Sequence, residues 1–407
     1  MRKFHAAGTV WLAEGTASTD FAEFCDRKFQ FFLKDTPRFT AQLKFMPSYQ
    51  IIPIKKLLFF ARSFLPAAGL LFMLSCQPQA DENTLQVVLP QTALRAAPGE
   101  KGREIGSLIA QDRLTDLGTV SQFETQLRLG NQSIMAPWLQ VKTPDGQQGW
   151  VFSGAVLPVI SQANWLLTKR MWCYFGPELS ARRDRWLATR DTIATEAGFA
   201  AFYREAVALR HTFTYRLAHR AEPNTTDVQP DFYWLREALP GFVYQRVAQG
   251  TQPYLFTDYR FFQLLAARTT GRQDDQLIAA YLTAYPIDSV ESAAPVWTMQ
   301  IADNEVVSQL GLHHHWQLLA AIDASLTTNS LFQPEWVRLK EAVLEDIFGK
   351  TVRYWQPKEK ILAELNKIIA SNFSTLTVAD RAALETRLAM FQKPSASGLQ
   401  VNLRVGE

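Results

Sequence analysis

The sequence contains few cysteines: Cys25, Cys76 and Cys173 are the only three in 407 residues. It has no Cys-x-x-Cys pair and no His-Glu-x-x-His segment, so the common ligand patterns for zinc are missing. It also lacks a glycine-rich phosphate loop and a dinucleotide-binding fingerprint. These absences exclude a disulfide-rich scaffold, and we expect neither a metal nor a cofactor.

A strongly basic composition is missing as well. The whole chain has 42 Lys/Arg and 39 Asp/Glu, a net charge of +3. Residues 1–75 hold ten of these basic and five of these acidic residues, so residues 76–407 carry 32 against 34, a net charge of −2. Binding of nucleic acid requires a concentrated basic face, so we expect no nucleic-acid partner.

The longest apolar stretch, residues 54–76 (IKKLLFFARSFLPAAGLLFMLSC), is interrupted by Arg62. Its uncharged part, residues 64–74, is shorter than the ~20 residues that span a bilayer and suits the core of a signal sequence. Leu74-Ser75-Cys76 resembles the lipobox of bacterial lipoprotein signal peptides. The resemblance implies cleavage before Cys76, a diacylglyceryl group on its thiol and a fatty acyl group on its new amino terminus. The alternative is a buried apolar helix or an uncleaved transmembrane anchor, with Cys76 there by chance. A lipidated cysteine and an uncleaved anchor would each tether an exported chain.

A signal peptide belongs at an amino terminus, so residues 1–45 need an explanation. If synthesis starts at Met46, residues 46–75 form a signal peptide of ordinary proportions and residues 1–45 are a spurious or disordered extension. The alternative is a cytoplasmic extension before a type II anchor. Residues 76–83 are polar and contain Pro78, which is typical of a flexible tether.

Residues 84–159 have the texture of a small all-β domain. Pro98-Gly99 and Pro144-Asp145-Gly146 are turn sequences between short apolar runs. The predicted strands are residues 85–89, 105–109, 114–117, 138–142 and 149–152.

One set of residues in this region resembles a bacterial SH3-like domain in order and spacing. The set is Leu94, Arg95, Pro98, Gly106, Leu108, Trp138, Val141, Gly146, Gly149, Trp150 and Val151. The resemblance implies a small barrel over residues 84–159 that binds peptidoglycan or wall peptides. Residues 121–136 are expected to form a loop longer than the family's, and Trp138 and Trp150 are predicted to be buried.

Residues 160–392 change to a helical period with few β-branched runs, which predicts an irregular all-α domain of about eight helices. Pro334 at a first turn and Gly349 at an end bound one helix, and Thr377 with Asp380 forms a capping pair. Residues 393–407 are a tail. The predicted helices lie within residues 182–220, 231–248, 258–268, 274–285, 304–325, 333–348, 357–370 and 381–391.

Candidate catalytic side chains are few. Cysteine peptidases need a thiolate activated by histidine, and His211 and His219 are the nearest histidines to Cys173. However, Cys173 lies among aromatic residues and lacks the Asp-Cys-Ser setting of wall peptidases, so we predict a buried thiol. Adjacent histidines on a helix point about 100° apart, so residues 313–315 do not converge on one metal, and we expect one of them to face the core.

Glu291 and Glu305 are carboxylates suited to acid–base work on glycan, but a glycosidase needs two carboxylates that face each other across a cleft. The aromatic residues within 231–262 are expected to be core, with a sugar- or peptide-binding cleft as the alternative.

The sequence therefore predicts a multidomain protein with a small SH3-like barrel followed by an all-α domain. We expect a non-catalytic binding or scaffold protein, anchored by lipid at Cys76 in the outer membrane or elsewhere in the bacterial cell envelope, facing the periplasm or the surface. Its expected partners are the membrane and either peptidoglycan or an envelope protein. The alternative is a wall hydrolase with an unrecognised active site in the helical domain.

Overall fold

The computed structural model describes residues 82–129, 131–220, 232–247, 250–302, 305–326, 330–349 and 351–403. The predicted extension (residues 1–45), the signal peptide (residues 46–75) and the lipidation site Cys76 lie outside the described residues. So does the tether, apart from its last two residues. Ala80–Glu407 form one compact unit.

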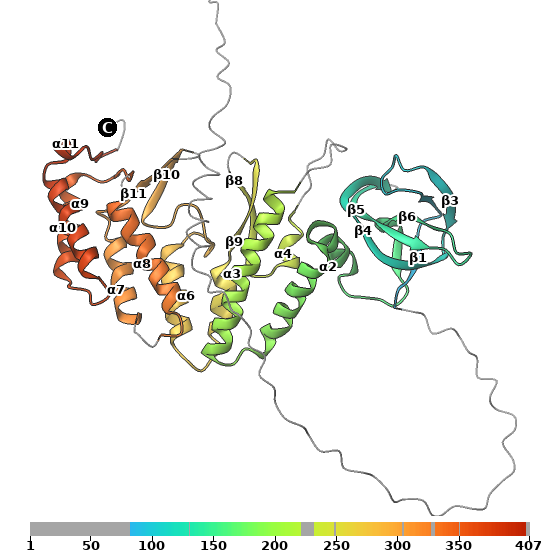
Figure 1. The fold of residues 1–407 in the computed structure, drawn as a ribbon, viewed down its shortest axis with the longest axis horizontal. Helices are drawn as coiled ribbons and strands as arrows, with labels where there is room; N and C mark the ends of the chain where they lie inside the picture. Colours follow the sequence, from blue (N-terminus) through green and yellow to red (C-terminus); the bar gives the residue numbers. More distant parts are fainter. Residues whose placement is uncertain are drawn as a thin grey trace, which may run out of the picture. The chain divides into compact units, whose positions relative to one another are not determined.

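A seven-stranded antiparallel sheet occupies the first part of the described chain (Figure 1). The strand order is β3-β2-β6-β5-β4-β1-β7, so β3 and β7 are the two edges. The strands are β1 (Thr84–Val87), β2 (Gln91–Arg95), β3 (Glu104–Ile109), β4 (Arg113–Leu129), β5 (Gln132–Lys142), β6 (Gln148–Phe152) and β7 (Val156–Pro158).

The predicted SH3-like barrel is wrong, because this sheet is open. Residues 121–136, expected to be a loop, continue β4 and β5 as a long hairpin whose register runs from Thr115–Lys142 to Leu129–Gln132. In this stretch Gln122 and Gln126 are exposed, whereas Glu124 and Thr125 are buried, so its polar residues do not all face solvent as those of an exposed loop would. The register shifts twice between Asp116 and Glu124, which bends the hairpin.

The inner face of the sheet is covered by the start of a helix. Leu85 and Val87 alternate with half-buried neighbours and pack in one cluster with Trp165, at the first turn of α2 (Trp165–Thr189). Leu166, the next residue, packs against this cluster and also against a second one that contains Trp138. Burial of Trp138 is confirmed, since it is 2% exposed and donates from Nε1 to Thr125 Oγ1 at 2.8 Å.

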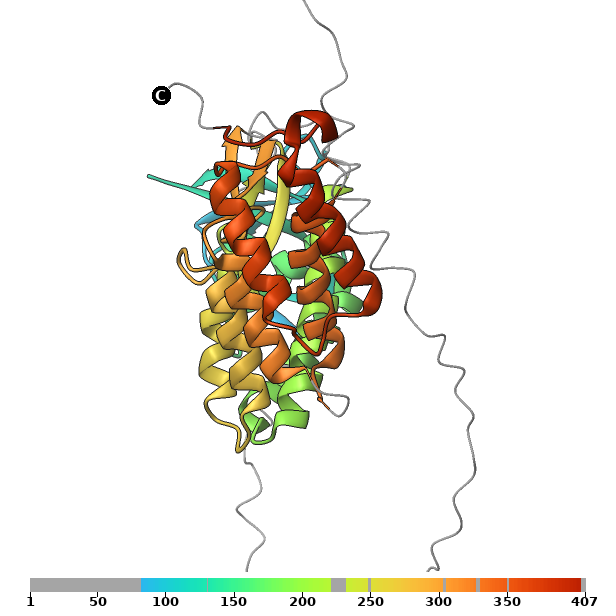
Figure 2. The same cartoon turned by 90° about the vertical axis from the view of Figure 1, so that its left-hand side faces the viewer.

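The chain then becomes mostly helical (Figures 1 and 2). Gly176, with φ +79°, and Pro177 kink α2. The other helices are α3 (Glu196–Ala218), α4 (Leu235–Ala238), α5 (Tyr259–Ala266), α6 (Gln273–Ala284), α7 (His314–Ser325), α8 (Gln333–Phe348), α9 (Lys358–Ala370), α10 (Val378–Gln392) and α11 (Pro394–Ser397), with 3₁₀ turns at Ser153–Ala155 and Arg190–Thr192.

The expectation of an all-α domain is also wrong, because two β-hairpins interrupt the helices. β8 (Phe242–Val247) pairs with β9 (Gln252–Thr257), and β10 (Thr298–Ala302) pairs with β11 (Glu305–Ser308). β8 lies within residues 231–248, where the spacing of the aromatic residues predicts a helix. Hairpin pairing is a contact between two segments, so the period of one segment alone does not reveal it.

One large apolar core joins the helices, and Phe199, Phe262 and Trp336 are among its most buried members. The aromatic residues of residues 232–262 are mostly part of this core, although Tyr233 is 78% exposed. Within the described ranges, none of the helices has both the length and the apolar character that a bilayer crossing demands.

Candidate functional site

Cys173 is a free, buried cysteine, as predicted. Burial raises the pKa of its thiol to about 12, so the thiol stays protonated near neutral pH. The charged groups that act on it are Arg220, Glu124 and Arg170, rather than a histidine. Without a thiolate or an adjacent base, Cys173 does not have the setting of a catalytic nucleophile.

The two nearby histidines of the sequence have other surroundings. Burial, with the neighbouring charges of Arg210 and Arg338, lowers the pKa of His211 to about 3, so its imidazole is neutral at physiological pH. His219 follows the last turn of α3 and is exposed, and its ring stacks on Tyr215 with 4.0 Å between centroids.

His315 is the buried member of the histidine triplet, whereas His313 is exposed. Its Nε2 lies 2.7 Å from Asp346 Oδ2, and Ser308 Oγ donates to that same oxygen at 2.5 Å. In a catalytic triad the imidazole stands between the hydroxyl and the carboxylate. Here the carboxylate of Asp346 lies between the hydroxyl and the imidazole, and Ser308 is 1% exposed. The arrangement therefore fixes His315 in place and does not activate the hydroxyl group. In the described part of the chain, no three His, Cys, Asp or Glu side chains gather in a way that would hold a metal.

Glu291 and Glu305 are each engaged by a different arginine. Arg210 Nη1 binds Glu291 Oε2, which also accepts the backbone N–H of Thr257 at 3.2 Å. Arg353 Nη2 binds Glu305 Oε1. Burial opposes the charge of Arg210, but Glu291 and the surrounding tyrosines raise its pKa overall. Glu291 therefore acts as the counter-ion of a buried arginine.

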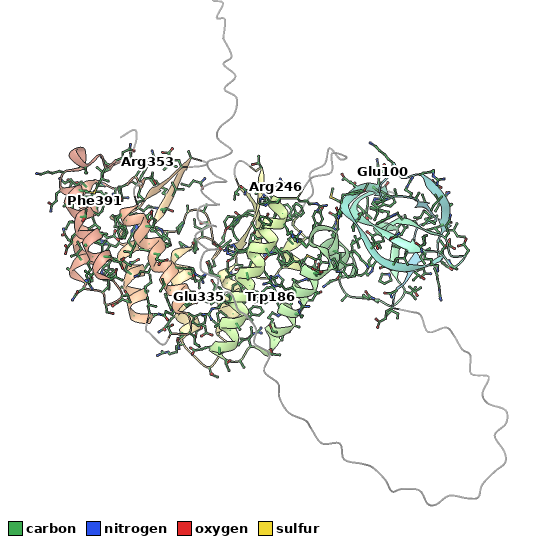
Figure 3. All side chains as sticks on the ribbon, in the orientation of Figure 1. Glu100, Trp186, Arg246, Glu335, Arg353 and Phe391 are labelled. Carbon is green, nitrogen blue, oxygen red and sulfur yellow. The ribbon has the colours of Figure 1, made fainter. Side chains whose placement is uncertain are left out.

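A cavity of about 580 Å³ lies between the end of α8, one face of α10 and the carboxy-terminal tail. The α10 residues are spaced by three and four, so they share one helix face. Figure 3 marks Arg353 and Phe391 in this part of the chain. The lining residues are Phe348, Thr351, Val352, Arg353, Ala383, Thr386, Arg387, Met390, Ser397, Gly398, Leu399 and Gln400.

The wall of the cavity that the carboxy-terminal tail forms is held in place by backbone hydrogen bonds. The amide of Tyr354 donates to Gln400 O at 3.0 Å, and that of Asn402 donates to Gln356 O at 3.1 Å. The opposite edge of the Tyr354 segment pairs with Ser308, at the end of β11. The tail is therefore fixed beside the segment that carries Arg353.

Arg387 is the charged side chain that the cavity buries most deeply, at 6% exposure. It donates from Nη2 to Gly349 O at 2.9 Å, at the carboxyl end of α8, where a cation is favoured by the helix dipole. Its guanidinium also hydrogen-bonds the phenol of Tyr354, whose pKa is raised by burial. We take this cavity as the candidate binding site.

Sequence reasoning missed Arg387. A signal was present, since Leu384, Arg387 and Phe391 follow each other at steps of three and four, and both apolar members are core residues. An arginine on the buried face of a helix is unusual unless it has a partner. The other walls lie in residues 348–353 and 397–400, and only the tertiary fold brings them to α10.

A smaller cavity of about 240 Å³ lies in the sheet, between β2, β3, the start of β4 and the turn before β6. It is below the size of most ligand pockets. Asp112 and Arg113 both line it, together with Asp145, so it offers both signs of charge.

Comparison of the sequence with models of protein families, with curated proteins and with solved structures gives no match.

Proposed function

We propose that this chain is a lipid-anchored protein of the bacterial cell envelope that acts by binding, as a scaffold for peptidoglycan or for an envelope protein. Anchoring rests on the lipobox-like Leu74-Ser75-Cys76 after a short apolar run. Several acyl chains on one cysteine would hold the protein stably in a bilayer, since a single chain is only a marginal anchor.

The single observation that supports binding over catalysis is the state of the reactive side chains. The thiol of Cys173 is buried and its pKa is raised, and His315 lies beside the carboxylates of Asp346 and Glu364. Glu291 is the counter-ion of Arg210. By contrast, the cavity of about 580 Å³ beside α10 is lined by neutral and cationic side chains, which suit recognition.

The test of binding is a pull-down of the detergent-solubilised chain on purified peptidoglycan, with released muropeptides measured in the supernatant. Retention without release supports the proposal. Release of muropeptides would contradict it in favour of a hydrolase. If neither retention nor release occurs, peptidoglycan is excluded and an envelope protein remains as the partner, to be sought by cross-linking in cells.

The test of anchoring is metabolic labelling with a fatty acid. Cys76→Ala should abolish labelling and leave an unprocessed precursor, whereas Cys173→Ala, the matched control, should label like the wild type. Labelling that persists in Cys76→Ala would refute the anchor.

A further inference from the structure

The cavity beside α10 contains a positive charge that the described residues do not balance. Both partners of the Arg387 guanidinium, Gly349 O and the Tyr354 phenol, are neutral. No carboxylate in the described ranges forms an ion pair with it. The second guanidinium of the lining, Arg353, is already paired with Glu305. A buried charge without a counter-ion is strongly unfavourable, so such a site is completed by an anion.

We propose that this cavity binds the terminal carboxylate of a short peptide, with the carboxylate on Arg387 and an apolar side chain against the walls. The proposal deepens the binding function proposed above and rests on it.

The charge of the site selects a carboxylate over a phosphate. One cation, Arg387, is left without a counter-ion, which matches a monoanion. A phosphate monoester carries nearly two charges and would need a second free cation. The planar guanidinium fork also fits a carboxylate in a two-bond arrangement.

The remaining walls suit a peptide with an apolar end. Phe348, Val352 and Met390 supply apolar surface, and the hydroxyl groups of Thr351 and Thr386 and the amide of Gln400 can bond peptide groups. The volume of about 580 Å³ lies in the range of sites that enclose small ligands, roughly 300–1,000 Å³. Capture of a terminal carboxylate is a recurring mode of peptide recognition.

The experiment is calorimetric titration of the detergent-solubilised full chain with acetyl-Ala-Ala-Leu as the free acid and as the carboxamide. The acid should bind at least about tenfold more tightly than the amide, because only the acid neutralises Arg387. Acetyl-Ala-D-Ala-D-Ala, also as acid and amide, identifies the source. Tighter binding of the D-peptide acid indicates a wall stem peptide, and tighter binding of the L-peptide acid indicates the end of a protein chain.

Two variants test the site itself. Arg387→Gln should reduce the affinity for the acid to that for the amide. Thr386→Trp should abolish binding of both, since Thr386 is an exposed residue on the α10 face of the cavity and the larger ring fills the space. The matched control is Arg260→Gln, which removes an exposed arginine of α5 and should leave both affinities unchanged.

Equal binding of acid and amide, or no binding of either acid to the wild type, would overturn the proposal. If circular dichroism shows that Arg387→Gln does not fold, the Thr386→Trp variant provides the test of the site. Unchanged binding of the acid by that variant would overturn the proposal. If these peptide titrations reject the site, retention of the wild type on peptidoglycan would still support the envelope-binding function.

Discussion

The carboxylate of Glu364 offers the sharpest test of what holds the helical region together. It is completely buried on α9 and accepts three backbone N–H groups at the start of α7. Its Oε2 binds Gly311 N at 2.5 Å and His313 N at 2.8 Å, and its Oε1 binds Trp316 N at 3.1 Å. The N–H groups of His313 and Trp316 are among those left over at the beginning of α7, and that of Gly311 lies in the turn before it, so a side chain from a different helix acts as the cap of α7.

Glu364→Gln keeps the shape and removes the charge. One amide oxygen can still accept from Gly311 and His313, but the NH₂ group then faces the N–H of Trp316, donor against donor. The change loses one charge-assisted hydrogen bond, worth about 1.5–3 kcal/mol, and strands a buried donor, which costs about 1–3 kcal/mol. The free energy of unfolding should therefore fall by about 2.5–6 kcal/mol.

Urea unfolding followed by tryptophan fluorescence measures this loss, and hydrogen exchange should show faster exchange at residues 311, 313 and 316. Glu341→Gln, on the exposed face of α8, is the control and should change stability by less than about 0.5 kcal/mol. A loss in Glu364→Gln as small as that of the control would refute the capping argument.

Three further expectations concern pH, the thiol and the sheet. The pKa of His211 in the fold, about 3, lies below the ordinary value of 6.5, so the stability it contributes is complete above about pH 6.5 and is lost as the pH falls towards 3. Wild type should therefore lose about 2 kcal/mol more than His211→Gln between pH 7 and pH 5, measured by urea unfolding, and equal losses would contradict this. In a chain with Cys25→Ser and Cys76→Ser, Cys173 should resist a maleimide at pH 7 until urea unfolds the protein, and rapid native labelling would show that the thiol is accessible. Trp165→Ala, which uncovers the inner face of the sheet, should cost about 3–5 kcal/mol and speed amide exchange in β1 and β5, whereas unchanged exchange there would show that α2 does not hold the sheet.

Local signals predicted the helix ends well. Pro334 and Gly349 bounded a predicted helix over residues 333–348, and α8 spans Gln333–Phe348. Thr377 and Asp380 were predicted to cap the helix that follows them, and both hydrogen bonds of the capping box are present. A helix start depends on residues a few positions apart, so the sequence contains the whole interaction.

The predictions that were wrong depend on contacts between segments that lie far apart in the sequence. The polar residues of 121–136 resemble turn residues and predict a loop, whereas the long β4–β5 hairpin depends on pairing between two segments. The alternation of turns and apolar runs predicted strands, but it did not determine whether the outer strands β3 and β7 meet. The same limit applies to the cavity, since Arg353, Arg387 and Gln400 become neighbours only in the packed fold.

The tail beside the cavity makes the shape of the cavity depend on a segment outside the long helices. Residues 397–400 form one wall, and the backbone hydrogen bonds to Tyr354 and Gln356 hold the tail there. Gly398, in a left-handed conformation, ends the short α11 within this wall. A single cut at this glycine would release one side of the cavity while α8 and α10 stay packed through the main core. The shape of the cavity can therefore be lost while the helical core stays folded.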